Sequence, residues 1–117
     1  MDLPAPLEAL FAAEQRRDWP ALGKLLHPDV TWTIVTGRGS HTVRGRQAYL
    51  ERLAAAYRDA PAATFSVHRT WLANDGLVAT ELVDDGGRVS LDVFALADGL
   101  VRHEWEHLLG VPHPAEP

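Results

Sequence analysis

Residues 88–109 have the sequence RVSLDVFALADGLVRHEWEHLL, and this stretch decides the fold. The pair Asp98-Gly99 separates two runs in which apolar and polar residues alternate, a pattern typical of two strands joined by a tight hairpin turn. We therefore expect strands over 88–96 and 100–109. Because side chains of a strand point alternately to its two faces, each strand has one face that can cover an apolar core.

The chain before this hairpin supplies the partners that such a face needs. Apolar residues at helical spacing predict three helices, and β-branched or alternating runs predict further strands. Helices followed by an antiparallel meander indicate an α+β fold, in which the sheet packs on the N-terminal helices. The expected elements are helices over 4–16, 19–26 and 46–58, a strand over 30–35, a loop over 36–40, and strands over 63–72 and 77–83.

Length and composition exclude several classes of protein. The 117 residues are enough for one domain, with a core over 5–110 and a tail over 111–117. The absence of cysteine excludes disulfides and thiolate chemistry, and the scattered basic residues in a chain of net charge −5 argue against nucleic acid. No apolar run is long enough to span a membrane, and the N-terminus does not look like a signal peptide, so we expect a cytoplasmic protein.

The order of these elements, together with four local matches, resembles the nuclear transport factor 2-like superfamily and more narrowly its SnoaL-like branch. The matching segments are residues 17–19, 25–32, 43–46 and 92–101. The resemblance implies a cone-shaped curved sheet closed by helices over one apolar pocket, in a protein that is often a homodimer. It does not imply one reaction, because this fold carries isomerases, cyclases, hydrolases and binding modules.

The catalytic residues of the relatives are only partly matched. In ketosteroid isomerases the base would fall on Ile34 and the oxyanion-hole tyrosine on Leu10, and only the pocket aspartate has a counterpart, at Asp92. In limonene epoxide hydrolases the acid of the last strand falls on Glu106, whereas the arginine falls on Leu82. Neither mechanism can therefore be transferred whole.

Asp92 and Glu106 are the residues that we expect to carry chemistry. Two carboxyls that share an apolar pocket acquire separate pKa values and can act as acid and base. The alternative is that both are solvated, or that Asp92 is bonded to a backbone amide or to Arg88. We expect the pocket to be lined by Leu10, Trp32, Ile34, Leu53, Tyr57, Leu82, Phe94 and Leu108.

The sequence thus predicts a protein that binds a small apolar molecule without a cofactor or metal. It is either an isomerase, cyclase or hydrolase that uses the pocket carboxyls for proton transfer, or a non-catalytic binding or dimerisation module. By strand alternation His103, Trp105 and His107 share one face, and the resemblance places this face on the outside of the sheet, where an aromatic patch favours pairing of two subunits. We expect no membrane and no nucleic-acid partner.

A second alternative comes from the last strand itself. His103, Glu104, His107 and His113 fit the pattern His-Glu-x-x-His-x-x-Gly-x-x-His, which resembles the metzincin zinc peptidases. That chemistry requires a helix, which brings the first two histidines together on one face. The hairpin pattern predicts a strand here, and the methionine turn that follows in metzincins has no counterpart, since the only methionine is Met1.

Overall fold

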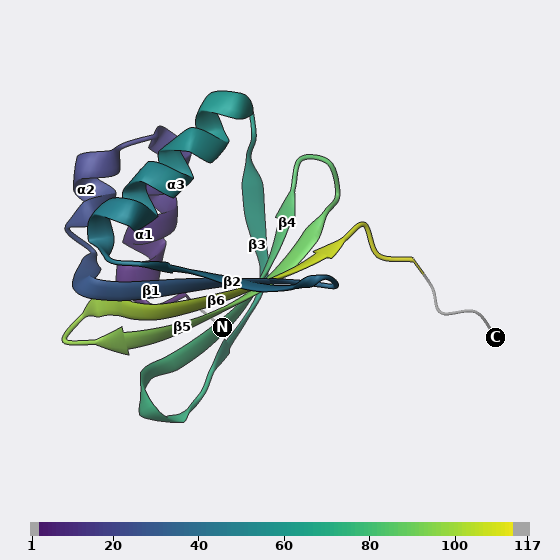
Figure 1. The fold of residues 1–117 in the computed structure, drawn as a ribbon. Coiled ribbons are helices and arrows are strands. Elements are labelled where there is room, and N and C mark those ends of the chain that lie inside the picture. The colour runs from purple at the N-terminus through teal and green to yellow at the C-terminus, as the bar shows by residue number, and fades with distance from the viewer. Residues whose placement is uncertain (1–2, 114–117) are drawn as a thin grey trace.

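Three helices lie against one side of a curved six-stranded sheet in the computed structural model, which describes residues 3–113 (Figure 1). This arrangement confirms the expected α+β class. The helices are α1 (Ala5–Arg16), α2 (Trp19–Gly23) and α3 (Arg46–Asp59). The strands are β1 (Leu26–Thr36), β2 (Gly39–Arg44), β3 (Phe65–Leu72), β4 (Leu77–Asp84), β5 (Val89–Ala97) and β6 (Leu100–Gly110), with a short 3-10 turn η1 (Asn74–Gly76) before β4.

The hairpin predicted from residues 88–109 is the centre of this sheet. The strand order is β2-β1-β6-β5-β4-β3, so β5 and β6 each have a neighbour on both sides. Asp98 and Gly99 both have positive φ, at 55° and 75°, as a tight turn of this kind requires. Asp92 lies opposite Glu106 in the antiparallel register of β5 and β6.

One pair of strands departs from the expected antiparallel sheet. The first strand, β1, lies beside the last, β6, and runs parallel to it, so the sheet is mixed. Most of the chain separates these two strands, and therefore no local turn signal could predict their pairing. The pairing brings Trp32 and Ile34 of β1 next to Glu104 and Glu106 of β6.

Several boundaries of the expected elements are wrong, since the strand expected over 30–35 covers Leu26–Thr36 and the strand expected over 63–72 begins at Phe65. The expected loop over 36–40 is shorter, because β2 begins at Gly39 and pairs with β1 at the sheet edge. This strand is largely exposed and lacks an alternating apolar pattern, which explains why it was not predicted.

The second helix ends at Gly23 rather than at residue 26. Leu26 instead pairs with Val101 of β6, and the ladder is then irregular until Thr31 pairs with His103. Pro28 lies in this irregular part and has no amide proton to donate to a ladder. Pairing with β6 therefore decides where this helix ends.

The junction between α1 and α2 fixes one side of the molecule. Arg17 ends α1 with φ 61°, and its Nη2 donates to the carbonyl oxygens of Pro61 and Ala63, at 3.0 and 2.7 Å. These bonds tie α1 to the connection between α3 and β3. Asp18 then begins α2, because its carboxylate accepts a hydrogen bond from the amide of Ala21.

The ends of the chain are described only in part. Residues 1–2 and 114–117 lie outside the described residues, so the expected tail over 111–117 is covered only at its start. Across the described part of the chain, no helix has the length and apolar character needed to span a membrane. The cytoplasmic location stays a prediction.

Leu26→Ala tests whether the parallel contact between β1 and β6 is part of the core. Leu26 is fully buried, so we expect this change to lower the free energy of unfolding by about 2–5 kcal/mol. Leu72→Ala on edge strand β3 is the control, because Leu72 is 52% exposed. Urea unfolding measures both, and equal losses in the two variants would contradict the burial of this contact.

Candidate functional site

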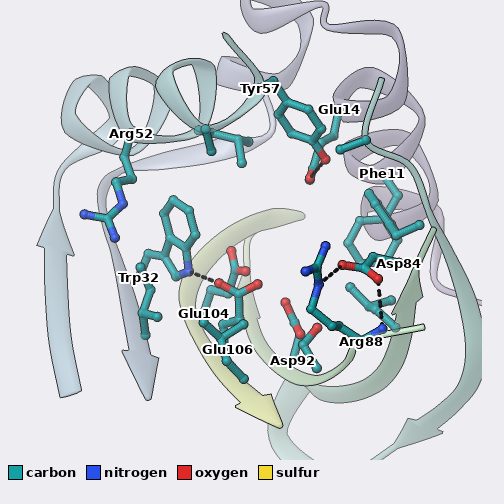
Figure 2. A pocket seen from close by; sticks show the side chains of 18 of the residues that line it. Phe11, Glu14, Trp32, Arg52, Tyr57, Asp84, Arg88, Asp92, Glu104 and Glu106 are labelled. Atoms are coloured by element: carbon teal, nitrogen blue, oxygen red, sulfur yellow. Dashed lines mark hydrogen bonds and ion pairs between the residues drawn. The ribbon is translucent and has the colours of Figure 1, made fainter. Parts of the chain in front are cut away.

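One cavity of about 550 Å³ lies between the inner face of the sheet and helices α1 and α3 (Figure 2). All eight residues expected to line a pocket do line this cavity, namely Leu10, Trp32, Ile34, Leu53, Tyr57, Leu82, Phe94 and Leu108. They come from both helices and from β1, β4, β5 and β6. Strand alternation and helical spacing, together with the resemblance that implies a pocket on this face, were therefore sufficient to identify this wall. The role of these residues in binding a ligand stays a prediction.

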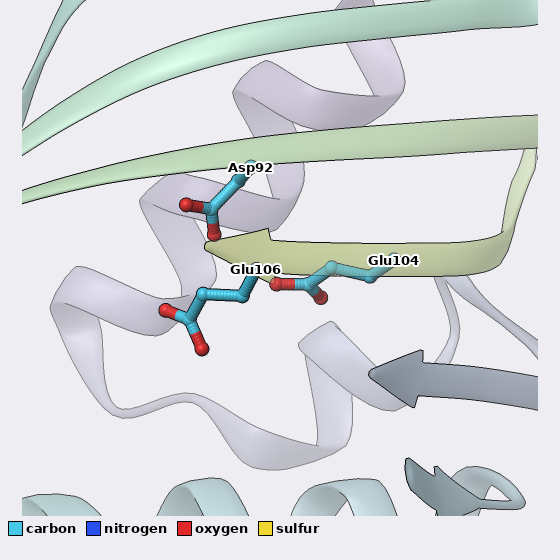
Figure 3. Close-up of side chains that lie close together, drawn as sticks. All are labelled: Asp92, Glu104 and Glu106. Atoms are coloured by element: carbon cyan, nitrogen blue, oxygen red, sulfur yellow. The ribbon is translucent and has the colours of Figure 1, made fainter. Parts of the chain in front are cut away.

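Asp92 and Glu106 also line this cavity, and a third carboxyl joins them. Glu104 lies two residues before Glu106 on the same face of β6 and is 5% exposed. One carboxylate oxygen from each of Asp92, Glu104 and Glu106 lies within 4.8 Å of the others (Figure 3). Asp92 and Glu106 are thus close enough to share the acid and base roles.

Asp92 is less exposed to water than Glu106, the other predicted site residue. Its side chain is 3% exposed, and Oδ1 has no hydrogen-bond partner within the described chain. Burial raises the pKa of Asp92 well above its usual value, and the neighbouring Glu106 carboxylate raises this pKa further. Arg88 does not pair with Asp92. It donates instead to Asp84, at 2.9 Å.

Glu104 is held by a hydroxyl that the sequence did not assign to the site. Tyr49 of α3, which is also buried, donates to Glu104 Oε1 at 2.5 Å. Burial and the charges of Asp92 and Glu106 raise the pKa of Glu104 well above its usual value, and the bond from Tyr49 opposes this rise. Tyr49 belongs to the apolar stripe of its helix, but this stripe alone does not reveal its hydroxyl contact.

Glu106 is the most accessible of the three carboxyls on the sheet. Trp32 Nε1 donates to Glu106 Oε1 at 3.2 Å (Figure 2). Burial raises the pKa of Glu106, whereas the bond from Trp32 and the positive charge of Arg52 lower it. Of the three groups, Glu106 therefore has the surroundings that best favour the anion.

A fourth carboxyl, Glu14, faces the cavity from α1 and was missed by the sequence analysis. Tyr57 donates to Glu14 Oε2 at 2.5 Å, and Arg17 lies over the Tyr57 ring at 3.8 Å from its centroid. Burial raises the pKa of Glu14 to about 7. The available signal is its position, because Glu14 continues the helical stripe of Leu7 and Leu10.

The histidine pattern of the last strand does not form the zinc site of a peptidase. Residues 103–107 lie in β6, so Glu104 points into the cavity while His103 and His107 point to the other face. His103 Nδ1 is bonded to Thr31 Oγ1 at 2.7 Å, and His113 is exposed beyond the strand. The zinc peptidase alternative is therefore unsupported.

Within residues 3–113, the side chains that lie close enough together to hold a metal ion are those of Asp92, Glu104 and Glu106.

Outside the cavity, His103 and Trp105 lie beside each other on the outer face, with ring centroids 5.5 Å apart. Dimerisation through His103, Trp105 and His107 stays a prediction.

A family model described as the SnoaL-like domain matches residues 7–106. The chain belongs to this family. The match spans nearly all of the residues over which the sequence resembled the SnoaL-like branch, and it contains Glu14, Asp92, Glu104 and Glu106. Among curated proteins, no match to the sequence was found.

Solved structures share the fold of this SnoaL-like protein. A Kribbella flavida protein provisionally assigned as a ketosteroid isomerase is 22% identical, with a TM-score of 0.78 over 97% of this chain and 82% of that one. A SnoaL-like Burkholderia thailandensis protein of unknown function is 20% identical, with a TM-score of 0.77 over 94% and 100%. An LEH-like epoxide hydrolase from M. tuberculosis is 23% identical, with a TM-score of 0.68 over 89% and 80%. At these identities the likeness shows the fold alone.

Glu14→Gln tests the burial of the fourth carboxyl through the pH dependence of stability. Between its usual pKa of 4.5 and its folded value of about 7, Glu14 keeps its proton in the folded chain and loses it in the unfolded chain. Its contribution to stability is therefore complete below pH 4.5 and is lost as the pH rises through 7. From pH 5 to pH 8, the free energy of unfolding should fall about 2–3 kcal/mol more in the parent protein than in Glu14→Gln.

Chemical denaturation across this pH range provides the measurement. Glu8→Gln is the matched control, since Glu8 lies on the exposed side of the same helix. We expect its curve to follow that of the parent protein. Parallel curves for Glu14→Gln and the parent protein would show that Glu14 is hydrated.

Proposed function

We propose that this SnoaL-like protein is a cofactor-free acid-base catalyst that acts on a small, largely apolar molecule with a carbonyl or epoxide oxygen. The proposal rests on one observation, which is that Asp92 and Glu106 converge in a cavity whose other walls are mainly apolar. Carboxyls in such surroundings have raised pKa values and can exchange protons near neutral pH. The cavity volume of about 550 Å³ is typical of small-molecule sites.

The surroundings of the two carboxyls suggest which of them is the acid. Asp92 is nearly inaccessible and lies beside two other carboxyls, so its protonated form is favoured. In the proposed reaction it donates this proton to the substrate oxygen. Glu106, whose anion is favoured by Trp32 and Arg52, accepts a proton from a substrate carbon or from an attacking water. One proton enters the substrate while another leaves it, so the protein ends with the same number of protons.

Tyr49 and Trp32 support these roles by fixing the carboxyls. Tyr49 donates to Glu104 and Trp32 donates to Glu106, and the two rings pack side by side with their centroids 4.8 Å apart. A group that donates protons along a defined direction needs such fixed neighbours. The two aromatic residues are therefore positioning residues in this proposal, with no proton transfer of their own.

A non-catalytic binding module is the second candidate. It is favoured by the apolar residues Ile34 and Leu82, which stand where the resemblance places catalytic residues of the relatives. It is also favoured by Glu14, Glu104 and Glu106, because each already accepts a hydrogen bond from an aromatic side chain. A turnover assay separates the two candidates, since a binding module stabilises a ligand complex without changing the ligand.

Proton exchange on cyclohexanone in deuterated water and hydrolysis of cyclohexene oxide provide this assay. We expect Asp92→Asn and Glu106→Gln each to lower the rate by about 10²–10⁴-fold, because each variant removes one partner of the acid-base pair. Mass spectrometry measures deuterium uptake and diol formation. Asp85→Asn is the control, since Asp85 is exposed in the turn between β4 and β5.

Unchanged rates in both variants would remove these carboxyls from the mechanism. Compounds that raise the melting temperature of the parent protein but are returned unchanged would support the binding module instead.

A further inference from the structure

The cavity has more acidic side chains than its own basic side chains can pair with. Glu14, Asp92, Glu104 and Glu106 face it, whereas the arginines at its lining are Arg52 and Arg88. Arg88 is already paired with Asp84 in the turn that closes β4 and β5 (Figure 2). Arg52 is exposed on α3. Four carboxyls thus share one exposed cation.

Hydrogen-bond donors are also too few. Tyr57, Tyr49 and Trp32 each donate one bond, to Glu14, Glu104 and Glu106 in that order. The remaining carboxyl, that of Asp92, has a buried Oδ1 that receives no hydrogen bond from any described residue. A buried carboxylate oxygen without a donor is costly, and such atoms are rare in folded proteins. The atom that is missing a partner lies inside the proposed site.

The walls of the cavity suit a cation better than a neutral polar molecule. Six aromatic side chains line it, namely Phe11, Trp32, Tyr49, Tyr57, Phe65 and Phe94. The faces of aromatic rings carry partial negative charge and attract organic cations, most strongly where water is excluded. About half of the remaining lining is aliphatic, including Leu53, Leu82 and Val89, and would contact the hydrocarbon part of such a molecule.

We propose that this cavity also binds a protonated amine with a compact hydrocarbon body, whose ammonium group lies between Asp92 and Glu106. This inference goes beyond the proposed function, because an ammonium group at that place deprotonates Asp92, so the amine is a second class of ligand and not the substrate of the proton transfer. The N–H groups supply the donor that Asp92 Oδ1 lacks, and the positive charge compensates the carboxylate that Asp92 becomes. A carboxyl that is neutral in the free protein loses its proton to the buffer when the ammonium group binds, so binding releases protons.

A divalent metal ion is a weaker occupant for the same carboxyls. Two of the three carboxyls that converge already accept bonds from Tyr49 and Trp32, which reduces their capacity as ligands. A hard cation such as Mg²⁺ also retains several waters, and the aromatic walls offer those waters few partners. An ammonium group with an apolar body needs no such waters.

The test compares cyclohexylamine with cyclohexanol, two molecules that share a ring and differ in the charge of the head group. Isothermal titration calorimetry at neutral pH should show cyclohexylamine binding at least about tenfold more tightly. Titrations in phosphate and in Tris should give different heats, because these buffers take up the released protons with different enthalpies. Neither measurement requires turnover.

Variants locate the preference in the carboxyl pair. Asp92→Asn and Glu106→Gln should each reduce the ratio of the two affinities toward one, whereas Asp85→Asn should keep the parent ratio. Circular dichroism identifies any variant that fails to fold, and the other variant of the pair then decides. An amine preference that survives in both folded variants would overturn the proposal.

Two further outcomes would also overturn it. Equal or tighter binding of cyclohexanol would show a site for neutral molecules, and it would leave the proton-exchange reaction on ketones intact. Stabilisation by Mg²⁺ or Mn²⁺ alone, lost in Asp92→Asn, would assign the carboxyls to a metal. Conversely, amine binding without any exchange on ketones would defeat the proposed catalysis and leave the amine site standing.

Discussion

The register of β5 and β6 is the constraint on which the rest of the structure depends. Asp92 lies opposite Glu106, and Phe94 lies opposite Glu104, all on the inner face. A slip of one residue in one strand would turn its inward side chains outward, because the side-chain period of a strand is two. The Asp98-Gly99 turn and the register shift that follows it, between the pairs Leu96–Val101 and Ala95–His103, together set this register. The same pairing therefore forms the core and assembles the carboxyls.

The burial of several carboxyls beside this hairpin lowers the stability of the fold. Buried carboxyls with raised pKa values are less favourable in a folded chain than apolar residues of the same size. The protein limits this cost with aromatic donors that also belong to the core, since Trp32 and Tyr49 are both less than 10% exposed and pack against each other. Removing either ring would therefore disturb both the packing of the core and the carboxyl cluster. Replacing a carboxyl by the matching amide changes its charge and leaves the packing of the rings in place.

Local patterns in the sequence predicted much of this structure, and non-local contacts account for the remainder. Turn residues and alternation identified the hairpins, and apolar spacing combined with the family resemblance identified the cavity wall. The parallel contact of β1 with β6 was not predictable, because it joins distant segments and ends α2 early at Gly23. Edge strand β2 lacks an apolar face. Glu14 was missed because a charged residue at the end of an apolar helical stripe usually reaches solvent, and only the position of Tyr57 shows that it does not.

The histidine pattern of β6 shows why a short motif has meaning only on a given backbone. On a helix, residues four apart lie close together on one face, whereas on a strand they lie about 13 Å apart. In β6 the same alternation that separates His103 from His107 sends Glu104 and Glu106 together to the inner face. The glutamate of the motif thus belongs to a carboxyl cluster beside Asp92, with Tyr49 as its partner in place of a metal. Backbone geometry, set by the pairing of β5 and β6, converts an apparent peptidase signature into half of a proposed acid-base site.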